Sequence, residues 1–188
     1  NCYGRPLAED VLSHCLYCGL CVTGLNFEVA PGQCEFQIRG EGITACDQIM
    51  IFRYILIRAA EKYSVQIDFH PKPVKGDWNG SGCHVNFSTI SMRSKGGYEK
   101  IINSMNKLKE KHLEHISIYG EDNDQRLTGL HETSSMTEFS YGIAHRGCSV
   151  RIPRETVENQ CGYFEDRRPA SNIDPYLVCS KILETIMM

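Results

Sequence analysis

Apolar residues recur at helical spacing in four stretches of the chain, and this pattern predicts four helices. They cover residues 6–18, 47–63, 98–115 and 175–186. Asp47, or Thr44 just before it, can cap the second helix, and Asp174 followed by Pro175 is a typical start for the last. The lysines of the third helix are expected to form a solvated face.

Shorter runs of alternating or β-prone residues predict strands between these helices. They lie at residues 26–38, as a hairpin turning at Pro31-Gly32, and at 65–69, 83–88, 148–152 and 162–166. In the run 83–88, alternation places His84, Asn86 and Ser88 on one face, opposite an apolar face. The remaining long stretches, 70–82, 120–147 and 167–174, are expected to be loops. This mixture predicts a single α+β domain.

Charge and composition exclude several kinds of partner. The 188 residues carry 20 Lys+Arg and 23 Asp+Glu, a net charge of −3, so no nucleic-acid partner is expected. The longest apolar stretch, residues 49–60, contains Arg53 and Arg58 and is too short to span a membrane. No membrane partner is expected either.

Ten cysteines without a secretion signal favour reduced thiols in the core of a cytoplasmic protein. They are Cys2, Cys15, Cys18, Cys21, Cys34, Cys46, Cys83, Cys148, Cys161 and Cys179. The spacing of Cys15, Cys18 and Cys21 also overlaps that of iron–sulfur ligands. Their place in and just after a predicted helix favours the core interpretation.

Four acidic or imidazole side chains stand on predicted strands: Glu28, Glu35, His84 and Glu165. An oxygen-rich set with one imidazole suits Mg2+ or Mn2+ better than Zn2+, although each glutamate alone could be an ordinary exposed residue. Arginines in neighbouring loops could clamp an anionic substrate or form a surface ion-pair network. These are Arg126, Arg146, Arg151, Arg154, Arg167 and Arg168. Phosphate-loop, dinucleotide-binding and serine-hydrolase motifs are absent from the sequence.

Six segments in order resemble glutamine synthetase of the eukaryotic type. They are residues 26–38, 69–73, 77–89, 126–133, 151–154 and 162–172, and the resemblance runs over essentially the whole chain. It implies the catalytic-domain fold, a curved antiparallel sheet backed by helices, over residues 1–188. It also implies that the chain begins inside that domain, without the N-terminal β-grasp domain and its E-x-E metal strand.

The resemblance implies ligation of ammonia to L-glutamate with ATP, through γ-glutamyl phosphate, in a ring-shaped homo-oligomer whose active sites lie between subunits. It carries over the metal ligands Glu28, Glu35, His84 and Glu165. It assigns glutamate binding to Trp78, Asn79, Gly80, Arg126, Arg146 and Arg167, and ATP binding to Glu35, Asn86, Ser88, Arg146, Arg151 and Tyr163. Glu132, Arg151 and Arg167 are the implied catalytic residues.

Two departures from the resemblance bear on activity. Asp77 and His145 stand where relatives usually have Asn, and the missing E-x-E ligands leave the site of this chain incomplete on its own. A glutamine-synthetase-like protein that binds without catalysing is therefore the alternative hypothesis. The retained glutamates, His84 and arginines favour the enzyme.

Overall fold

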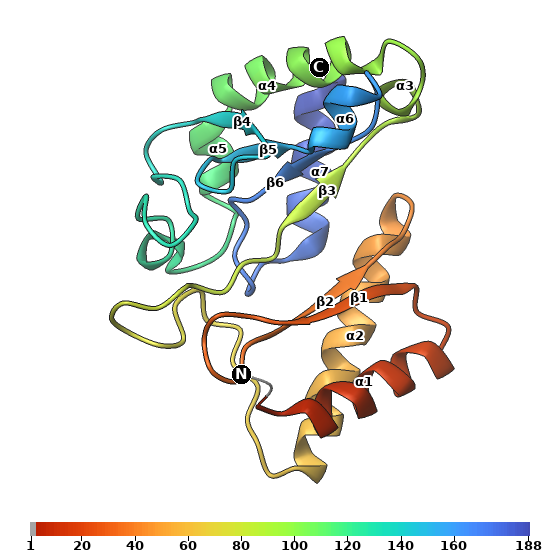
Figure 1. Cartoon of the computed structure of the whole chain (residues 1–188), viewed down its shortest axis with the longest axis vertical. Helices are drawn as coiled ribbons and strands as arrows, with labels where there is room; N and C mark the ends of the chain where they lie inside the picture. The colour runs from red at the N-terminus through yellow and green to blue at the C-terminus, as the bar shows by residue number, and fades with distance from the viewer. Residues whose placement is uncertain (1–2) are drawn as a thin grey trace. The chain divides into compact units, whose positions relative to one another are not determined.

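The computed structural model describes residues 3–188 and divides the chain into two compact units, Asn1–Phe69 and His70–Met188 (Figure 1). Cys2 lies outside the described residues. Each unit has its own group of buried apolar side chains, so each is described by itself.

The first unit is a two-stranded hairpin packed against two helices. Its elements are α1 (Arg5–Tyr17), β1 (Val22–Phe27), β2 (Cys34–Ile38) and α2 (Ile43–Lys62). The strands are antiparallel, with Phe27 opposite Cys34. Val11 of α1 and Leu56 of α2 are buried in one cluster, where the Phe36 ring of β2 lies 4.8 Å from that of Phe52. Burial of these apolar faces, as the sequence predicted, holds the hairpin on the helices.

Three local predictions for this unit need correction. Glu28 lies just after β1 rather than on a strand, because the strand is displaced toward the N-terminus. The helix α2 begins at Ile43, after Gly42 at φ 55°, and neither Thr44 nor Asp47 caps it. Residues 65–69 belong to no described strand; Ile67 and Phe69 nevertheless pack on the core as the alternation predicted. The alternation reflects one-sided burial, which does not require a strand partner.

The second unit is built on a four-stranded sheet. Its elements are β3 (Val85–Phe87), α3 (Ile90–Arg93), α4 (Gly97–Glu110), α5 (His112–Ile116), the 3-10 turn η1 (Asn123–Gln125), β4 (Tyr141–Ile143), β5 (Val150–Ile152), α6 (Arg154–Glu158), β6 (Phe164–Asp166) and α7 (Pro175–Met187). The strand order is β3-β6-β5-β4. The β4–β5 pair is parallel and the other pairs are antiparallel. The α+β class is thus confirmed, with a parallel pair that the sequence did not predict.

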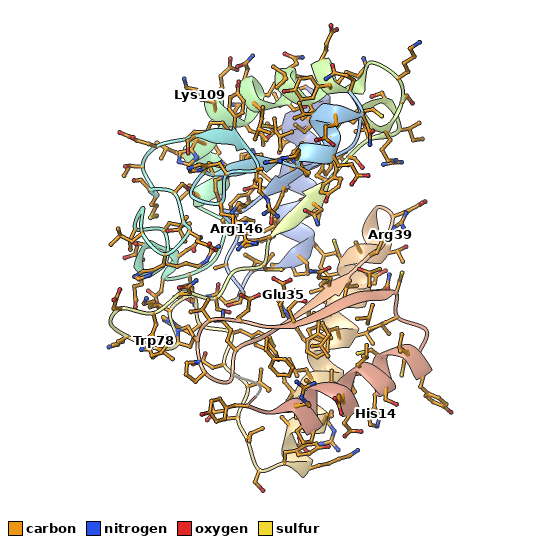
Figure 2. All side chains as sticks on the ribbon, viewed as in Figure 1. His14, Glu35, Arg39, Trp78, Lys109 and Arg146 are labelled. Atoms are coloured by element: carbon orange, nitrogen blue, oxygen red, sulfur yellow. The ribbon has the colours of Figure 1, made fainter. Side chains whose placement is uncertain are left out.

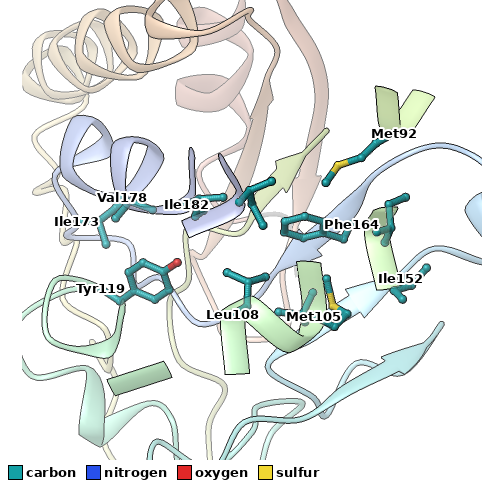
Figure 3. Packing of buried hydrophobic residues seen from close by; sticks show 12 residues of the cluster. Met92, Met105, Leu108, Tyr119, Ile152, Phe164, Ile173, Val178 and Ile182 are labelled. Atoms are coloured by element: carbon teal, nitrogen blue, oxygen red, sulfur yellow. The ribbon is translucent and has the colours of Figure 1, made fainter. Parts of the chain in front are cut away.

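One face of this sheet is covered by helices. Phe164 of β6, Leu108 of α4 and Ile182 of α7 are completely buried in a single cluster (Figure 3). Val150 and Ile152 of β5 belong to the same cluster, and Val85 and Phe87 of β3, from the predicted apolar face of residues 83–88, pack against it. The opposite face of the same strands is therefore left to polar residues.

The helix and loop predictions for this unit are largely confirmed. Asp174 accepts hydrogen bonds from the amides of Tyr176 and Leu177 and so caps α7 as expected. The predicted helix 98–115 is two helices, α4 and α5, which meet at Lys111. Lys109 projects from the exposed side of α4 (Figure 2). The sequence missed the short helices α3 and α6, which are too short to show a helical period, and it missed β4, which lies within the predicted loop 120–147.

The core interpretation of the cysteines holds only in part. Cys15, Cys46 and Cys148 are buried, but Cys18 and Cys21 are exposed, because α1 ends at Tyr17 and the chain leaves the helical face. The nine described cysteines are thiols rather than disulfide partners. Among residues 3–188, no helix combines the length and apolar character that a membrane span needs.

Beneath the sheet, a buried polar network joins β6 to α5 and α7. Arg168 and Asp166, both with fully buried side chains, form an ion pair with Nη2 and Oδ2 2.7 Å apart. The Tyr119 hydroxyl donates to Asp166 at 2.8 Å and lies 2.6 Å from His115 Nδ1. On the other side of its ring, His115 Nε2 lies 2.8 Å from the hydroxyl of Thr185 in α7. These contacts satisfy polar groups that would be costly to bury alone.

We expect the stability of the protein to fall as the pH drops from about 6.5 to about 4, with His115 among the causes. Burial, reinforced by the charge of Arg168, lowers the pKa of His115 to about 4. Below the ordinary histidine pKa of about 6.5, the unfolded chain binds a proton that the folded protein rejects, so acid favours unfolding. In urea unfolding at several pH values, His115→Gln should flatten this dependence and His14→Gln, at an exposed site, should not. An unchanged slope in His115→Gln would contradict the assignment.

Candidate active site

The register of the sheet in the second unit aligns polar residues on its open face. Asn86 of β3 is opposite Glu165 of β6, which is in turn opposite Arg151 of β5. Because directly opposed residues point to the same side of a sheet, these three form a row across it. The neighbours of Asn86 and Arg151 along their strands, and Phe164 before Glu165, face the apolar core.

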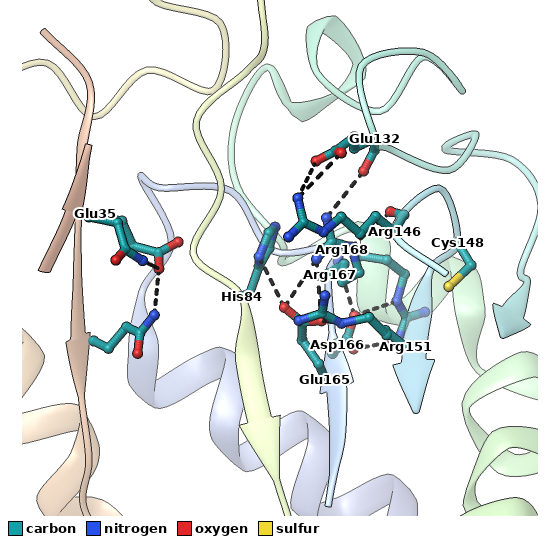
Figure 4. Close-up of polar contacts among 12 residues, drawn as sticks. Glu35, His84, Glu132, Arg146, Cys148, Arg151, Glu165, Asp166, Arg167 and Arg168 are labelled. Carbon is teal, nitrogen blue, oxygen red and sulfur yellow. Dashed lines mark hydrogen bonds and ion pairs between the residues drawn. The ribbon is translucent and has the colours of Figure 1, made fainter. Parts of the chain in front are cut away.

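Glu165 is the centre of this row and has three basic neighbours (Figure 4). Its carboxylate lies 3.3 Å from His84 Nδ1 and 3.1 Å from Arg167 Nη1, and it also pairs with Arg151. Burial alone would raise the pKa of Glu165, but the His84 hydrogen bond and the charges of Arg167 and Arg151 outweigh it and lower the pKa to about 2. The carboxylate is therefore ionised at neutral pH.

Arg167 connects Glu165 to two loops. Its Nε donates to the backbone oxygen of Arg146 at 2.9 Å, and its Nη2 donates to the backbone oxygen of Glu132 at 3.3 Å. Only 8% of its side chain is exposed. A guanidinium with donors fixed in one plane can hold three separate segments in a constant arrangement.

Glu132 lies at the tip of a closed loop with an unusual backbone. The two sides of the loop are joined by an isolated β-bridge between Thr128 and Ser135, and Met136 N donates a hydrogen bond to Leu127 O. At the tip, His131 and Glu132 have φ angles of 52° and 60°. Two consecutive non-glycine residues in the left-handed region store strain, which the surrounding contacts must offset. Such strain is concentrated at functional sites.

The Glu132 side chain is exposed to solvent and is paired with an arginine. Both of its carboxylate oxygens lie 3.4 Å from Arg146 Nη1. The side chains are 51% and 62% exposed, so solvent weakens this pair and both groups can turn to a ligand.

Arg126 also lies at this site, in contact with His84 and with the backbone of Arg167. Its Nη2 lies 3.2 Å from His84 Nε2 and donates to Arg167 O at 2.8 Å. A Cβ at Gly82 would lie 2.5 Å from that nitrogen, and one at Gly80 would lie 2.6 Å from Arg126 Cγ. Glycines at these two positions thus make room for the arginine. Burial lowers the pKa of Arg126 to about 10, which leaves it charged at neutral pH.

The structure brings together seven residues predicted from the sequence. They are His84, Arg126, Glu132, Arg146, Arg151, Glu165 and Arg167. Gly80 adjoins this group through Arg126, whereas Trp78, with 37% exposure, and Asn79 lie along the loop before β3. Asn86 and Tyr163 are exposed, and Ser88 accepts a hydrogen bond from Arg93. Arg154, which begins α6, is exposed.

Two contacts in this region have no signal in the sequence. The carboxylate of Asp77 lies 3.2 Å from His131 Nε2 and links the Trp78 loop to the Glu132 loop. Arg93 holds Ser88 through both its hydroxyl and its backbone oxygen. Asp77, His131 and Ser88 lie outside helices and strands, and α3, which ends at Arg93, has only four residues, so no periodicity indicates the direction of these side chains.

Glu28 and Glu35 belong to the first unit. Glu35 lies on β2 opposite Asn26, and its Oε1 accepts hydrogen bonds from Asn26 Nδ2 and Gln37 Nε2. Glu28 N donates to Gln33 O across the turn of the hairpin. Both glutamates therefore stand at the end of the hairpin nearest the turn.

The donor chemistry of His84 and Glu165 fits a divalent cation. Together they offer one imidazole nitrogen and two carboxylate oxygens, and ions such as Mg2+ commonly use one or two protein ligands and complete their shell with water and phosphate oxygens. No group of three His, Cys, Asp or Glu suited to a metal ion occurs within residues 3–188.

An ionised carboxylate and an imidazole surrounded by arginines can hold a divalent cation and an anionic ligand. Comparison with known proteins identifies the family. Residues 3–115 match the family model described as "Glutamine synthetase, catalytic domain". The chain belongs to this family.

Named relatives agree with the family assignment. The chain is 59% identical over 187 residues to "Putative glutamine synthetase" of Acanthamoeba polyphaga mimivirus, covering 99% of this chain and 53% of that protein. It is 55% identical to "Glutamine synthetase" of Saccharomyces cerevisiae, over 98% of this chain and 50% of the relative. It is 54% identical to "Glutamine synthetase cytosolic isozyme 1-1" of Oryza sativa, over 99% of this chain and 52% of the relative. The chain thus spans about half the length of these relatives.

Proposed function

We propose that the full-length protein joins ammonia to L-glutamate with hydrolysis of ATP and so forms L-glutamine. The γ-phosphoryl group of ATP passes to the side-chain carboxylate of glutamate, which gives γ-glutamyl phosphate and ADP. Ammonia then forms the amide bond as inorganic phosphate leaves. The observation that carries this proposal is the contact of Glu165 with His84, Arg151 and Arg167 in a member of the glutamine synthetase family.

The arginines are proposed to hold the anionic groups of the reactants. Arg151 and Arg167 flank Glu165 and can donate hydrogen bonds to the phosphoryl oxygens as negative charge develops on those oxygens. Arg146, with its exposed guanidinium, is suited to bind a carboxylate of glutamate and the phosphates of ATP. Arg126 is assigned to glutamate as well, and its contact with His84 gives it the further task of orienting that imidazole.

Glu28 and Glu35 are proposed to hold one divalent cation, and His84 and Glu165 a second, each Mg2+ or Mn2+. When bound, such a cation neutralises charge on phosphate oxygens. The Glu165 carboxylate is ionised, as a ligand to such a cation must be, and a cation held by His84 and Glu165 would replace the contacts that these side chains make with each other and with Arg126. Glu35 is also assigned to the ATP site, with Asn86, Ser88 and Tyr163.

Glu132 is proposed to take a proton from ammonium, and its loop is proposed to cover bound glutamate. Trp78, Asn79 and Gly80 are proposed to line the glutamate site. The Glu132 carboxylate is solvent-accessible and its backbone is held by Arg167, so it can accept a proton at a fixed place in the site. Exclusion of water by this loop would protect the acyl phosphate from hydrolysis.

Further features of the whole protein are proposed from the family. Both units of the chain are assigned to one catalytic domain, and a homo-oligomeric ring with sites between subunits is expected. Relatives from Oryza sativa and Pinus sylvestris are named cytosolic isozymes, and we propose a cytoplasmic location here as well.

The direct test is an assay of the full-length protein with glutamate, ATP, ammonia and Mg2+ or Mn2+. We expect glutamine and inorganic phosphate in equal amounts, with neither formed when the cation is removed by a chelator. Hydroxylamine in place of ammonia should give γ-glutamyl hydroxamate, because it traps an acyl phosphate. Binding of ATP and glutamate without any product would instead support the non-catalytic alternative.

A further inference from the structure

A continuous chain of buried hydrogen bonds leads from β6 to the loop that carries Glu132. Asp166 accepts from Arg168 Nε at 2.9 Å and Nη2 at 2.7 Å. The remaining terminal nitrogen of Arg168, Nη1, lies 2.9 Å from His112 Nδ1. His112 Nε2 in turn lies 3.0 Å from the backbone oxygen of Met136. His112 is thus the link between the guanidinium and the loop.

The chemistry of the partners fixes the direction of every bond in this chain. A guanidinium can only donate, so His112 Nδ1 accepts from Arg168. Burial and the charge of Arg168 lower the pKa of His112, which keeps the ring neutral. A neutral ring that accepts at Nδ1 carries its proton on Nε2, and it therefore donates to Met136 O.

Met136 lies at the base of the loop that carries Glu132. Its amide donates to Leu127 O at 3.1 Å, next to the bridge between Thr128 and Ser135. Phe139 supplies a second anchor, since Arg168 lies 5.3 Å from the centre of its ring and His112 meets that ring edge-on at 5.8 Å. Residues 136–139 are thereby held at two points, by His112 at Met136 and by Arg168 and His112 at Phe139.

We propose that His112 is a positioning residue that, through Arg168, holds the base of loop 127–136 at a fixed place relative to β6. Glu165 and Arg167 alternate with Asp166 and Arg168 along the chain. The buried ion pair of Asp166 and Arg168 therefore fixes the position of β6, which carries Glu165, and also the position of the loop base. The consequence for catalysis rests on the proposed function of Glu132; the mechanical role of His112 does not.

Two substitutions of His112 separate the links of this chain. His112→Gln places an amide donor near the position of Nε2 and should preserve the bond to Met136 O. His112→Asn places its polar atoms near Nδ1 and should leave Met136 O without that donor. In hydrogen–deuterium exchange of the full-length protein, we expect amides of residues 127–136 to exchange about tenfold faster in His112→Asn. The increase should be smaller in His112→Gln, which keeps the bond to Met136 O but loses the acceptor for Arg168.

Thr185→Val is the matched control, because it removes a hydrogen bond to His115 from the same buried network on the side of α7. It should lower overall stability without selective exchange in residues 127–136. Equal exchange in that segment for His112→Asn and Thr185→Val would overturn the proposal. We also expect glutamine formation to fall in His112→Asn and to recover in His112→Gln; native activity in both would overturn the positioning role. Absence of activity in the unsubstituted protein would refute the proposed function, while the exchange comparison would still decide the role of His112.

Discussion

Glu165→Ala should abolish glutamine formation by the full-length protein, with a loss in kcat of at least about 10³-fold. The substitution removes a proposed metal ligand and the carboxylate that compensates Arg151 and Arg167. Those two guanidinium groups and Arg126 would then repel one another and any divalent cation. Steady-state assays at saturating ATP, glutamate and ammonia measure the loss, and calorimetric titration with Mn2+ should show weakened binding.

Glu158→Ala provides the control, since Glu158 is exposed at the end of α6, away from the open face of the sheet. It should retain native turnover and native Mn2+ binding. Glu165→Gln preserves the shape of the side chain and should also be inactive, which separates loss of charge from loss of packing. Native turnover in Glu165→Gln would refute the assignment of Glu165 to the metal.

Arg168→Met should lower the free energy of unfolding by about 3–5 kcal/mol, as expected when one partner of a buried ion pair is removed. Asp166 has a fully buried side chain, and Arg168 supplies two donors to its carboxylate. The substitution leaves that charge with Tyr119 as its remaining side-chain donor and also removes the donor to His112. Urea unfolding followed by circular dichroism measures the change.

A second substitution tests whether the unpaired charge is the cause. Asp166→Asn combined with Arg168→Met should recover part of the stability, because an amide costs less to bury than an ionised carboxylate. Arg154→Met, at an exposed position, should change stability by no more than about 0.5 kcal/mol. A loss in Arg168→Met as small as that of Arg154→Met would contradict a structural role for the pair.

Side-chain alternation predicted the face of β3 that carries the site. His84 and Asn86 were placed opposite Val85 and Phe87, and the latter two do pack on the core. One-sided burial imposes this pattern on any short strand, so the sequence alone reveals it. The same logic failed to distinguish a strand from an extended segment at residues 65–69, where burial is one-sided but no described strand pairs with the segment.

Contacts between distant segments were beyond the reach of the sequence. The row from Asn86 through Glu165 to Arg151 depends on strand order and register. The role of Arg168 was hidden for a similar reason: it follows Arg167 directly, yet one guanidinium faces Glu165 and the other is buried against Asp166. Adjacent arginines look alike in a sequence until the strand before them assigns each to a face.

The sequence by itself determined the family, the α+β class and the residues with the required chemistry, because motifs and apolar periods are local properties of the chain. Only the tertiary structure decided which charges neutralise one another. It pairs Glu165 with His84, Arg151 and Arg167, and it gives Glu132 its strained backbone. It also brings His112 to Met136, a contact that no sequence pattern indicates. Ion pairs and hydrogen bonds depend on distances in space, which are fixed only when the strands and helices pack.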